Sequence, residues 1–232
     1  MTVSFDIVPA GPQTATPEQV TVAPTVVAIA GFTGRDQAAV AAHLAELAEL
    51  GVPTPAATPC YYQAPPSVLT QADTVTVVRS ETSGEAECVI VVDGDDAYLT
   101  LGSDHTDRAA EAIDIQLSKL LCPKPLARAA WRLDRVAERA ETFELRSWVV
   151  EDDGTEVLYQ EGLVSAFMRF DEIIAGIPFA ARPPSFTLFC GTLPAIGGIR
   201  PARRFRAELR DPADGTAISL AYDTVSAALL DL

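Results

Sequence analysis

Ser83-Gly-Glu-Ala-Glu-Cys-Val-Ile-Val-Val-Asp-Gly-Asp-Asp-Ala-Tyr-Leu-Thr-Leu-Gly-Ser-Asp-His-Thr-Asp-Arg108 is the stretch of sequence that decides the fold. It holds two apolar runs, at residues 89–92 and 98–101, on either side of turn residues at 93–96. Short apolar runs joined by an Asp-Gly turn predict two paired strands. The stretch therefore predicts a β-hairpin with acidic residues at its open end.

These acidic residues form the first candidate site. Glu85 and Glu87 are two positions apart, and because strand side chains alternate between faces, both carboxylates point to the same surface. Gly102-Ser-Asp104 ends the return strand and brings a third carboxylate toward them. Three oxygen ligands suit Mg²⁺ or Mn²⁺, and Ca²⁺ is the ion expected to replace them in a crystal. The residues alone leave open a second interpretation, an exposed strand edge with charged side chains turned to solvent.

Charge and composition limit the partners of the chain. A formal net charge of −15 over 232 residues excludes nucleic acid and anionic membranes, since neither is attracted to such a surface. The N-terminus lacks a basic start, and no segment approaches the roughly 20 apolar residues that span a bilayer. The cysteines are far apart and are typical of free thiols in a reducing compartment; they are Cys60, Cys88, Cys122 and Cys190. We expect a cytoplasmic protein that binds a small molecule.

The rest of the chain predicts many strands and a few helices. Residues 36–50 place Val40, Leu44 and Leu47 on one helical face, and further helices are expected at 106–121 and 134–141. Strands are expected at 26–31, 74–79, 143–150, 155–159 and 186–190, with a hairpin turn at 211–215. Residues 1–24, rich in Pro, Thr and Gln, predict an N-terminal arm, and residues 25–232 predict one domain. Strands and helices in no regular alternation indicate the α+β class.

The hairpin motif resembles the metal site of the fumarylacetoacetate hydrolase superfamily. Members carry Glu-x-Glu-Leu and later Asn-Asp-x-Thr-Ala-Arg-Asp, and here Glu85, Glu87 and Asp104 fall on the ligand positions, with Arg108 following. Ser118-Lys119 before Cys122-Pro123, and Gly191-Thr192-Leu-Pro-Ala-Ile-Gly-Gly198, match later motifs in the same order. The resemblance runs from about Thr25 to the C-terminus. It implies a mixed β-sandwich roll with flanking helices, and a homodimer.

A second candidate group lies on the first predicted helix. His43 and Glu46 are three residues apart, so the carboxylate can orient the imidazole as a general base. Taken alone, the spacing favours a half-buried histidine beside a solvated glutamate. The resemblance favours the dyad, because acylpyruvase-like members carry His-x-x-Glu upstream of a Phe-x-Lys-Pro segment. Here that segment corresponds to Tyr62-Gln63-Ala-Pro65, which places Gln63 among the substrate-binding residues.

Three departures from the family pattern leave the substrate open. The lysine before proline is absent, Asp107 replaces the alanine before Arg108, and Gly84 stands where a tyrosine or histidine often precedes Glu-x-Glu. They leave the metal ligands intact, so the chain is expected to belong to a poorly characterised branch.

The reaction implied by the resemblance is hydrolysis of a carbon–carbon bond in a 1,3-dicarbonyl, acylpyruvate-like oxo acid. The metal would polarise the 2-oxo acid, His43 held by Glu46 would deprotonate water, and Lys119 with Arg108 would neutralise developing negative charge. Gly191 and Thr192 would offer backbone N–H groups to the substrate carboxylate. A decarboxylase, hydratase or isomerase of a related oxo acid is the alternative. A noncatalytic protein that binds a metal or an oxo acid is the third possibility.

Overall fold

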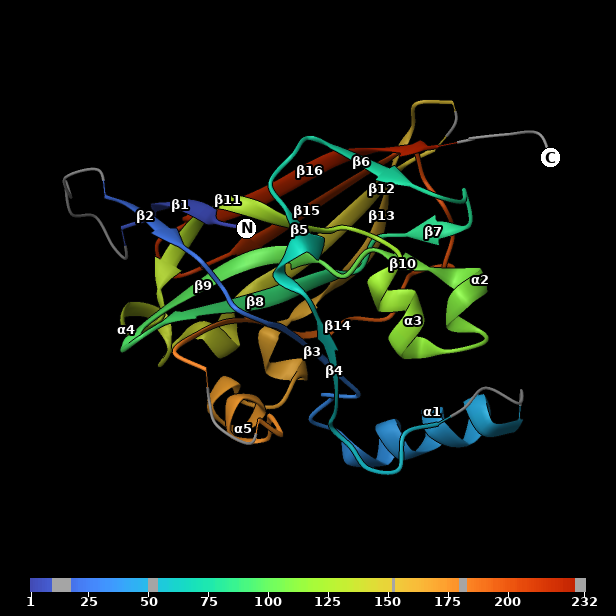
Figure 1. Cartoon of the computed structure of the whole chain (residues 1–232), viewed down its shortest axis with the longest axis horizontal. Helices are drawn as coiled ribbons and strands as arrows, with labels where there is room; N and C mark the ends of the chain where they lie inside the picture. Colours follow the sequence, from blue (N-terminus) through green and yellow to red (C-terminus); the bar gives the residue numbers. More distant parts are fainter. Residues whose placement is uncertain (10–17, 50–53, 152, 180–182, 228–232) are drawn as a thin grey trace.

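The computed structural model of the protein describes residues 1–9, 18–49, 54–151, 153–179 and 183–227, without the side chains of residues 43, 46 and 47. Within these residues two β-sheets pack against each other, and short helices lie at their edges (Figure 1). This arrangement confirms the α+β class predicted from the sequence. None of the helices in the described ranges has the length and apolar character needed to cross a membrane.

The larger sheet is mixed and carries the predicted hairpin at its centre. Its strands in spatial order are β2 (Gln19–Val22), β1 (Val3–Ile7), β11 (Lys124–Arg132), β9 (Asp96–Ser103), β8 (Ala86–Asp93), β14 (Ser185–Thr192), β3 (Val27–Gly31) and β4 (Cys60–Ala64), with β5 (Leu69–Thr70) pairing with β11. β8 and β9 form the hairpin, with Glu87 opposite Gly102 and Asp93 opposite Asp96. Gly94 in the turn has a positive φ of 62°, a conformation that glycine adopts without strain.

The second sheet covers one face of the first. Its order is β13 (Glu156–Leu163), β12 (Glu144–Val150), β15 (Arg204–Arg210), β16 (Ala217–Ser226) and β6 (Thr74–Val77). A two-stranded piece, β7 (Thr82–Ser83) with β10 (Thr106–Asp107), stands beside the open end of the hairpin. The helices are α1 (Gln37–Glu49), α2 (Arg108–Glu111), α3 (Ile115–Leu120), α4 (Leu133–Val136) and α5 (Phe170–Ala175), with 3-10 turns at Pro66–Val68, Ala140–Thr142 and Val164–Ala166.

Alternation along β8 explains where the core and the candidate site lie. Cys88 and Ile90 point into the main core between the two sheets. Val89 and Val91 point to the other face of the large sheet and join a second apolar cluster. Because Glu87 is two residues before Val89, its side chain extends from that second face. The main core and the candidate site therefore lie on opposite sides of the same strand.

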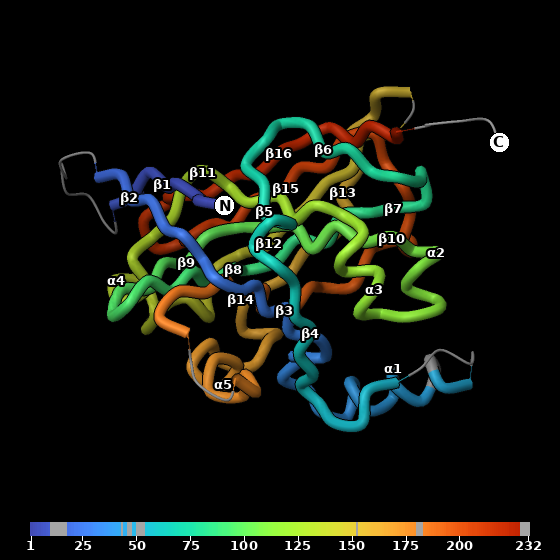
Figure 2. The backbone as a smooth tube through the Cα atoms, viewed as in Figure 1, coloured from blue at the N-terminus to red at the C-terminus, as the bar shows by residue number. Residues whose placement is uncertain are grey.

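The structure corrects three expectations about local structure. The N-terminal segment is not a loose arm, because β1 and β2 extend the large sheet beside β11 and bury Val3 and Phe5 (Figure 2); residues 10–17 of that segment lie outside the described residues. The helix expected at 106–121 is divided into α2 and α3, since Asp114 accepts a hydrogen bond from the Leu117 N–H and begins a new helix. The helix expected at 134–141 is reduced to α4 and a 3-10 turn.

Candidate metal centre

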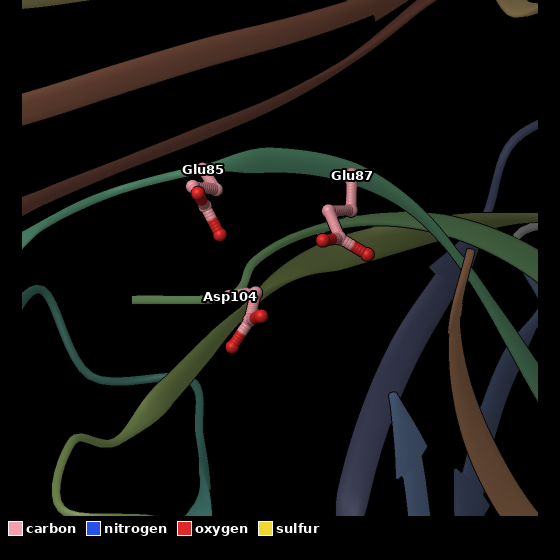
Figure 3. Close-up of side chains that lie close together, drawn as sticks. All are labelled: Glu85, Glu87 and Asp104. Carbon is pink, nitrogen blue, oxygen red and sulfur yellow. The ribbon is translucent and has the colours of Figure 1, made fainter. Parts of the chain in front are cut away.

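Three carboxylates meet at the open end of the β8–β9 hairpin. Glu85 lies directly before β8, Glu87 within it, and Asp104 directly after β9. One oxygen from each lies within 4.8 Å of the others, and Figure 3 shows the three side chains grouped on one side of the hairpin. The predicted convergence of these residues is therefore present in the structure.

The hairpin register accounts for this meeting. Ala86 pairs with Ser103 and Glu87 with Gly102, so the residues that flank Asp104 point to the face opposite its own. The Asp104 N–H donates a hydrogen bond of 3.0 Å to the carbonyl oxygen of Glu85, which closes the end of the hairpin. The shared face of the three carboxylates follows from strand alternation and this one backbone bond.

Glu87 is the most deeply placed of the three, with only 2% of its surface exposed. Its Oε2 accepts a hydrogen bond of 2.8 Å from the Gly191 N–H. Burial, followed by the nearby charges of Asp104 and Glu85, raises the pKa of Glu87 well above its usual value. A buried carboxylate beside two others is costly without a further cation, which is the condition that a metal ion relieves.

Asp104 receives an ammonium group on each side. Lys119 Nζ lies 2.7 Å from Oδ2 and Lys124 Nζ lies 2.7 Å from Oδ1. Burial alone would raise the pKa of Asp104, but the two lysines together hold this pKa below its usual range. Lys119 is predicted from the sequence as a residue of this site, whereas Lys124 is not. The available signal was composition, since these are the only two lysines in the chain.

Each of the three guanidinium nitrogens of Arg108 lies close to an oxygen of the protein. Its Nε, Nη1 and Nη2 lie 2.8, 2.6 and 2.9 Å from oxygens of Ser83, Glu111 and Glu85. Lys119 Nζ also lies 3.6 Å from Glu85 and 3.7 Å from Glu111. The guanidinium of Arg108 thus holds Glu85, and its expected role in neutralising charge on the substrate stays a prediction. Glu111, which is not predicted from the sequence, is the fourth carboxylate here.

The residues present fit a hard divalent cation. Lys124 directs its hydrogen bond to the carbonyl oxygen of His105, and in the described part of the chain no donor makes a hydrogen bond of good geometry to the buried Oδ1 of Asp104. The ligand-capable atoms are all carboxylate oxygens, the donors that Mg²⁺ and Mn²⁺ prefer. Among the described residues, four carboxyl groups face three cations, so the site carries one excess negative charge when all four, Glu87 included, are ionised to bind a metal.

Gly191 and Thr192 are the last residues of β14, and the hydrogen bonds described for them go to protein groups. The Gly191 N–H is committed to Glu87, and a side chain at this position would lie 2.0 Å from Oγ1 of Thr33. The Thr192 hydroxyl donates to the carbonyl oxygen of Ala86 and accepts from Gln160. Both residues thus support β8. A contact from Gly191 to a substrate carboxylate would require its bond to Glu87 to break.

The remaining predicted site residues are Gln63, which the structure describes, and His43 and Glu46, whose side chains it does not describe. Gln63 is in β4 and its side chain is exposed. Its backbone N–H donates to the side chain of Gln116 in α3, and its carbonyl oxygen accepts from the same side chain. The helix predicted to carry His43 and Glu46 is present as α1. The side chains of His43 and Glu46 are outside the described residues, so the dyad stays a prediction.

His105, the other histidine, is held on the inner side of Asp104. Its Nδ1 lies 2.8 Å from the Tyr222 hydroxyl and its Nε2 lies 2.8 Å from the Thr82 hydroxyl. Burial, and then the charges of Lys124 and Arg108, lower the pKa of His105 to about 3. Both ring nitrogens are engaged, so this imidazole has no nitrogen left to activate a water molecule at the carboxylates.

Two departures from the family pattern now have structural reasons. The Asp107 carboxylate accepts a hydrogen bond from the Ala110 N–H, begins α2, and pairs with Arg79. At Gly84, a Cβ would lie 2.6 Å from the Phe205 ring and 2.7 Å from the Tyr222 hydroxyl. The second sheet fills the space that a side chain at position 84 would need.

Comparison with known proteins supports this architecture. A family model described as a protein of unknown function (DUF2848) matches residues 30–222. The solved structure of Cg1458 has a TM-score of 0.63 at 15% identity, covering 93% of this chain and 86% of that chain. A structure of 2-keto-3-deoxy-D-arabinonate dehydratase complexed with magnesium and 2,5-dioxopentanoate has a TM-score of 0.62 at 16% identity, covering 88% and 73%. No curated protein matches the sequence. At these identities the structural likeness shows a shared fold.

Proposed function

The chain belongs to the DUF2848 family and has the fold of the fumarylacetoacetate hydrolase superfamily, and from this premise we propose that it is a divalent-metal-dependent enzyme acting on a small 2-oxo acid. The main observation behind this proposal is that the carboxylates of Glu85, Glu87 and Asp104 lie close together beside the ammonium group of Lys119. A cation held by these carboxylates would polarise the oxo group as a Lewis acid. The solved dehydratase of the same fold, whose complex contains magnesium and a dioxo acid, supports this class of substrate.

Lys119 is the residue best placed to serve the reacting groups. Its ammonium group lies near Asp104, Glu85 and Glu111 and donates to the Thr106 hydroxyl at 3.3 Å. Preorganised positive charge next to a developing oxyanion lowers the barrier without reorganisation during the reaction. Arg108 lies between Glu85 and Glu111, and we assign it the task of holding Glu85 in place. Lys119 is therefore the proposed catalytic cation, and Arg108 a positioning residue.

The charge balance favours a substrate with a single negative charge. Four carboxylates face three cations among the described residues of the site. A divalent cation would turn the excess negative charge into an excess positive charge. One carboxylate on the substrate would neutralise the centre, whereas two would again leave uncompensated charge where burial makes it costly. We infer that the substrate is a monocarboxylate with an uncharged remainder.

The reaction proposed first is hydrolysis of a carbon–carbon bond in an acylpyruvate-like acid. This reaction needs a base that removes a proton from water. Of the two histidines in the chain, His105 has both nitrogens bonded, which leaves His43 with Glu46 as the proposed base. Dehydration of a 2-keto-3-deoxy acid is the second candidate, supported by the similar fold of 2-keto-3-deoxyarabinonate dehydratase. That reaction needs no hydrolytic water.

Metal analysis and turnover test the proposal together. The protein is stripped with chelator, reloaded with Mg²⁺ or Mn²⁺, and given acylpyruvates, a 2-keto-3-deoxy sugar acid and a dicarboxylate analogue. We expect one divalent ion per chain and turnover of a monocarboxylate only in the loaded protein, with Glu87→Gln inactive. Turnover of the sugar acid alone would select dehydration over hydrolysis. Stoichiometric metal without turnover of any oxo acid would support the noncatalytic alternative, and absence of metal binding would remove the proposal.

A further inference from the structure

We propose that Tyr222 is a positioning residue for the candidate metal centre: its single hydroxyl group, supplied by the second sheet, fixes the backbone of the residues that carry Asp104 and Glu85. The inference rests on the metal site of the proposed function. It goes beyond that site because Tyr222 lies more than a hundred positions along the chain from the ligands. Within the described residues its hydroxyl bonds Ser103 and His105 and none of the three carboxylates. It assigns a function to a buried polar cluster that the reaction itself does not use.

The Tyr222 hydroxyl bonds both neighbours of Asp104. It lies 2.9 Å from Oγ of Ser103 and 2.8 Å from Nδ1 of His105. Because side chains alternate, Ser103 and His105 point inward to the second sheet while Asp104 points outward to the other carboxylates. A group that holds both inward neighbours also fixes the direction of the residue between them.

The same cluster extends to a second ligand. Oγ of Ser103 accepts a hydrogen bond of 3.2 Å from the N–H of Glu85. Ser103 thus joins the Tyr222 hydroxyl to the residue that starts the Glu-x-Glu motif. Two of the three ligand residues are therefore connected to one phenolic oxygen, Asp104 through the side chains of its neighbours Ser103 and His105, and Glu85 through its N–H and Ser103.

The far end of the cluster is anchored as well. Nε2 of His105 lies 2.8 Å from Oγ1 of Thr82 in β7, which pairs with β10 just after Asp104. A consistent set of donors exists, in which Ser103 donates to Tyr222, Tyr222 to Nδ1 of His105, and Nε2–H of His105 to Thr82. Ordered chains of this kind hold ligand residues in one orientation, and losing an outer partner of a metal ligand typically costs 10- to 100-fold in metal affinity.

The glycine at position 84 lets the backbone before the Glu-x-Glu motif lie close to the Tyr222 hydroxyl. Tyr222 is fully buried, and a Cβ at Gly84 would lie 2.7 Å from its hydroxyl. Only glycine allows the strand that precedes Glu85 to approach the phenol so closely. The ring also packs against Phe205 at a centroid distance of 5.5 Å, which is a packing role that phenylalanine would preserve. Tyr222→Phe therefore separates the hydroxyl from the ring.

Tyr222→Phe is compared with Tyr159→Phe in the full-length protein. Tyr159 is also buried, and its hydroxyl has no hydrogen-bond partner among the described residues, so removing this hydroxyl deletes the same atom as in Tyr222→Phe without breaking a described bond. Mn²⁺ affinity is measured by calorimetry without substrate, and thermal stability is measured separately in chelator. We expect Tyr222→Phe to weaken Mn²⁺ binding by about 10-fold or more and Tyr159→Phe to leave it unchanged.

Ser103→Ala provides a second route to the same result. It removes the link between Tyr222 and the Glu85 N–H, so it should also weaken Mn²⁺ binding, and the double variant should lose less than the two single losses together. Wild-type Mn²⁺ affinity in Tyr222→Phe would overturn the inference and leave the metal site standing. Equal weakening in Tyr159→Phe would also overturn it, by showing a general effect of buried hydroxyl loss. Absence of Mn²⁺ binding by the wild-type protein would instead remove the metal site and the inference with it.

Discussion

The ammonium group of Lys124 lies 2.7 Å from the carboxylate of Asp104, and neither side chain has more than 2% of its surface exposed. Lys119 holds the other oxygen of the same carboxylate at the same distance. The chain thus places both of its lysines on one aspartate. Lys124 also donates to the carbonyl oxygen of His105, so it fixes the turn that carries Asp104 in addition to balancing its charge.

Lys124→Met is expected to destabilise the fold in the metal-free protein by about 3 kcal/mol or more. Removing one partner of a buried ion pair leaves the other charge poorly compensated, here together with an unpaired backbone carbonyl. Urea unfolding in chelator measures the loss. Arg128→Met on the same strand is the control, because Arg128 and its partner Asp73 are exposed and such pairs contribute little. Similar stabilities for the two variants would contradict the assigned role of Lys124.

Glu87→Gln is expected to abolish tight metal binding without harming the metal-free fold. Glutamine keeps an acceptor for the Gly191 N–H. It removes a buried carboxyl group whose ionised form is disfavoured by the negative charges of Asp104 and Glu85. The thermal midpoint in chelator should therefore equal or exceed that of the wild-type protein, while Mn²⁺ binding is lost. The control is Glu49→Gln on the exposed face of α1. Full metal content in Glu87→Gln would show that these carboxylates do not hold the ion.

The hairpin and its carboxylates could be predicted from the sequence because they depend on local rules. Alternation along β8 and the Asp-Gly turn fix the face and the register, and both follow from neighbouring residues. The division of the helix at 106–121 was also encoded locally, in Asp114, but an apolar pattern continuing past it concealed the boundary. The role of Asp107 as a helix cap was likewise readable from its residue type.

The contacts made across the fold could not be predicted in this way. Tyr222 and Gly191 reach the centre from strands far along the chain, and no spacing rule connects them to Asp104 or Glu87. The N-terminal strands are a different case, since Val3-Ser-Phe-Asp-Ile7 alternates apolar and polar residues as a strand does, whereas its pairing with β11 is a contact across the fold that this local pattern does not specify. Tertiary contacts of this kind override weak local preferences.

Glu111→Gln is expected to change which substrates the site accepts. The Glu111 carboxylate pairs with Arg108 at 2.6 Å and lies 3.7 Å from Lys119, so removing its charge leaves one more positive charge uncompensated. KM for a dicarboxylate oxo acid should fall by about 3- to 10-fold relative to a monocarboxylate, the effect of roughly 1 kcal/mol at a partly exposed pair. Steady-state kinetics on both substrates, with Glu138→Gln as an exposed control, measure the ratio. An unchanged ratio would contradict the charge-balance argument.

His105 is expected to remain neutral well below the pH at which an ordinary histidine is protonated. Its pKa in the folded protein is about 3, below the ordinary histidine value of 6.5, so between these two pH values the folded state binds fewer protons than the unfolded state. The stabilisation linked to this group is complete above pH 6.5 and is lost as the pH falls toward 3. In His43→Gln only one histidine remains, so its ring signals in NMR spectra can be followed without ambiguity. A midpoint near 6.5 would show that the buried cluster around Tyr222 is not formed.

His43→Gln separates the proposed base from the metal centre. His43 lies on α1 and is not one of the three proposed metal ligands, which are all carboxylates, so the substitution should leave Mn²⁺ affinity unchanged. If the reaction is hydrolysis, kcat should fall by roughly 10²- to 10⁴-fold, the usual contribution of general acid–base catalysis. Glu46→Gln should cost less, because an orienting carboxylate does not itself transfer the proton, and Glu49→Gln on the same helix should have no effect. Wild-type hydrolysis by His43→Gln would exclude the dyad as its base. Wild-type dehydration by the same variant, with no hydrolysis by the native protein, would assign the chain to the lyase reaction, for which Lys119 and the carboxylates suffice.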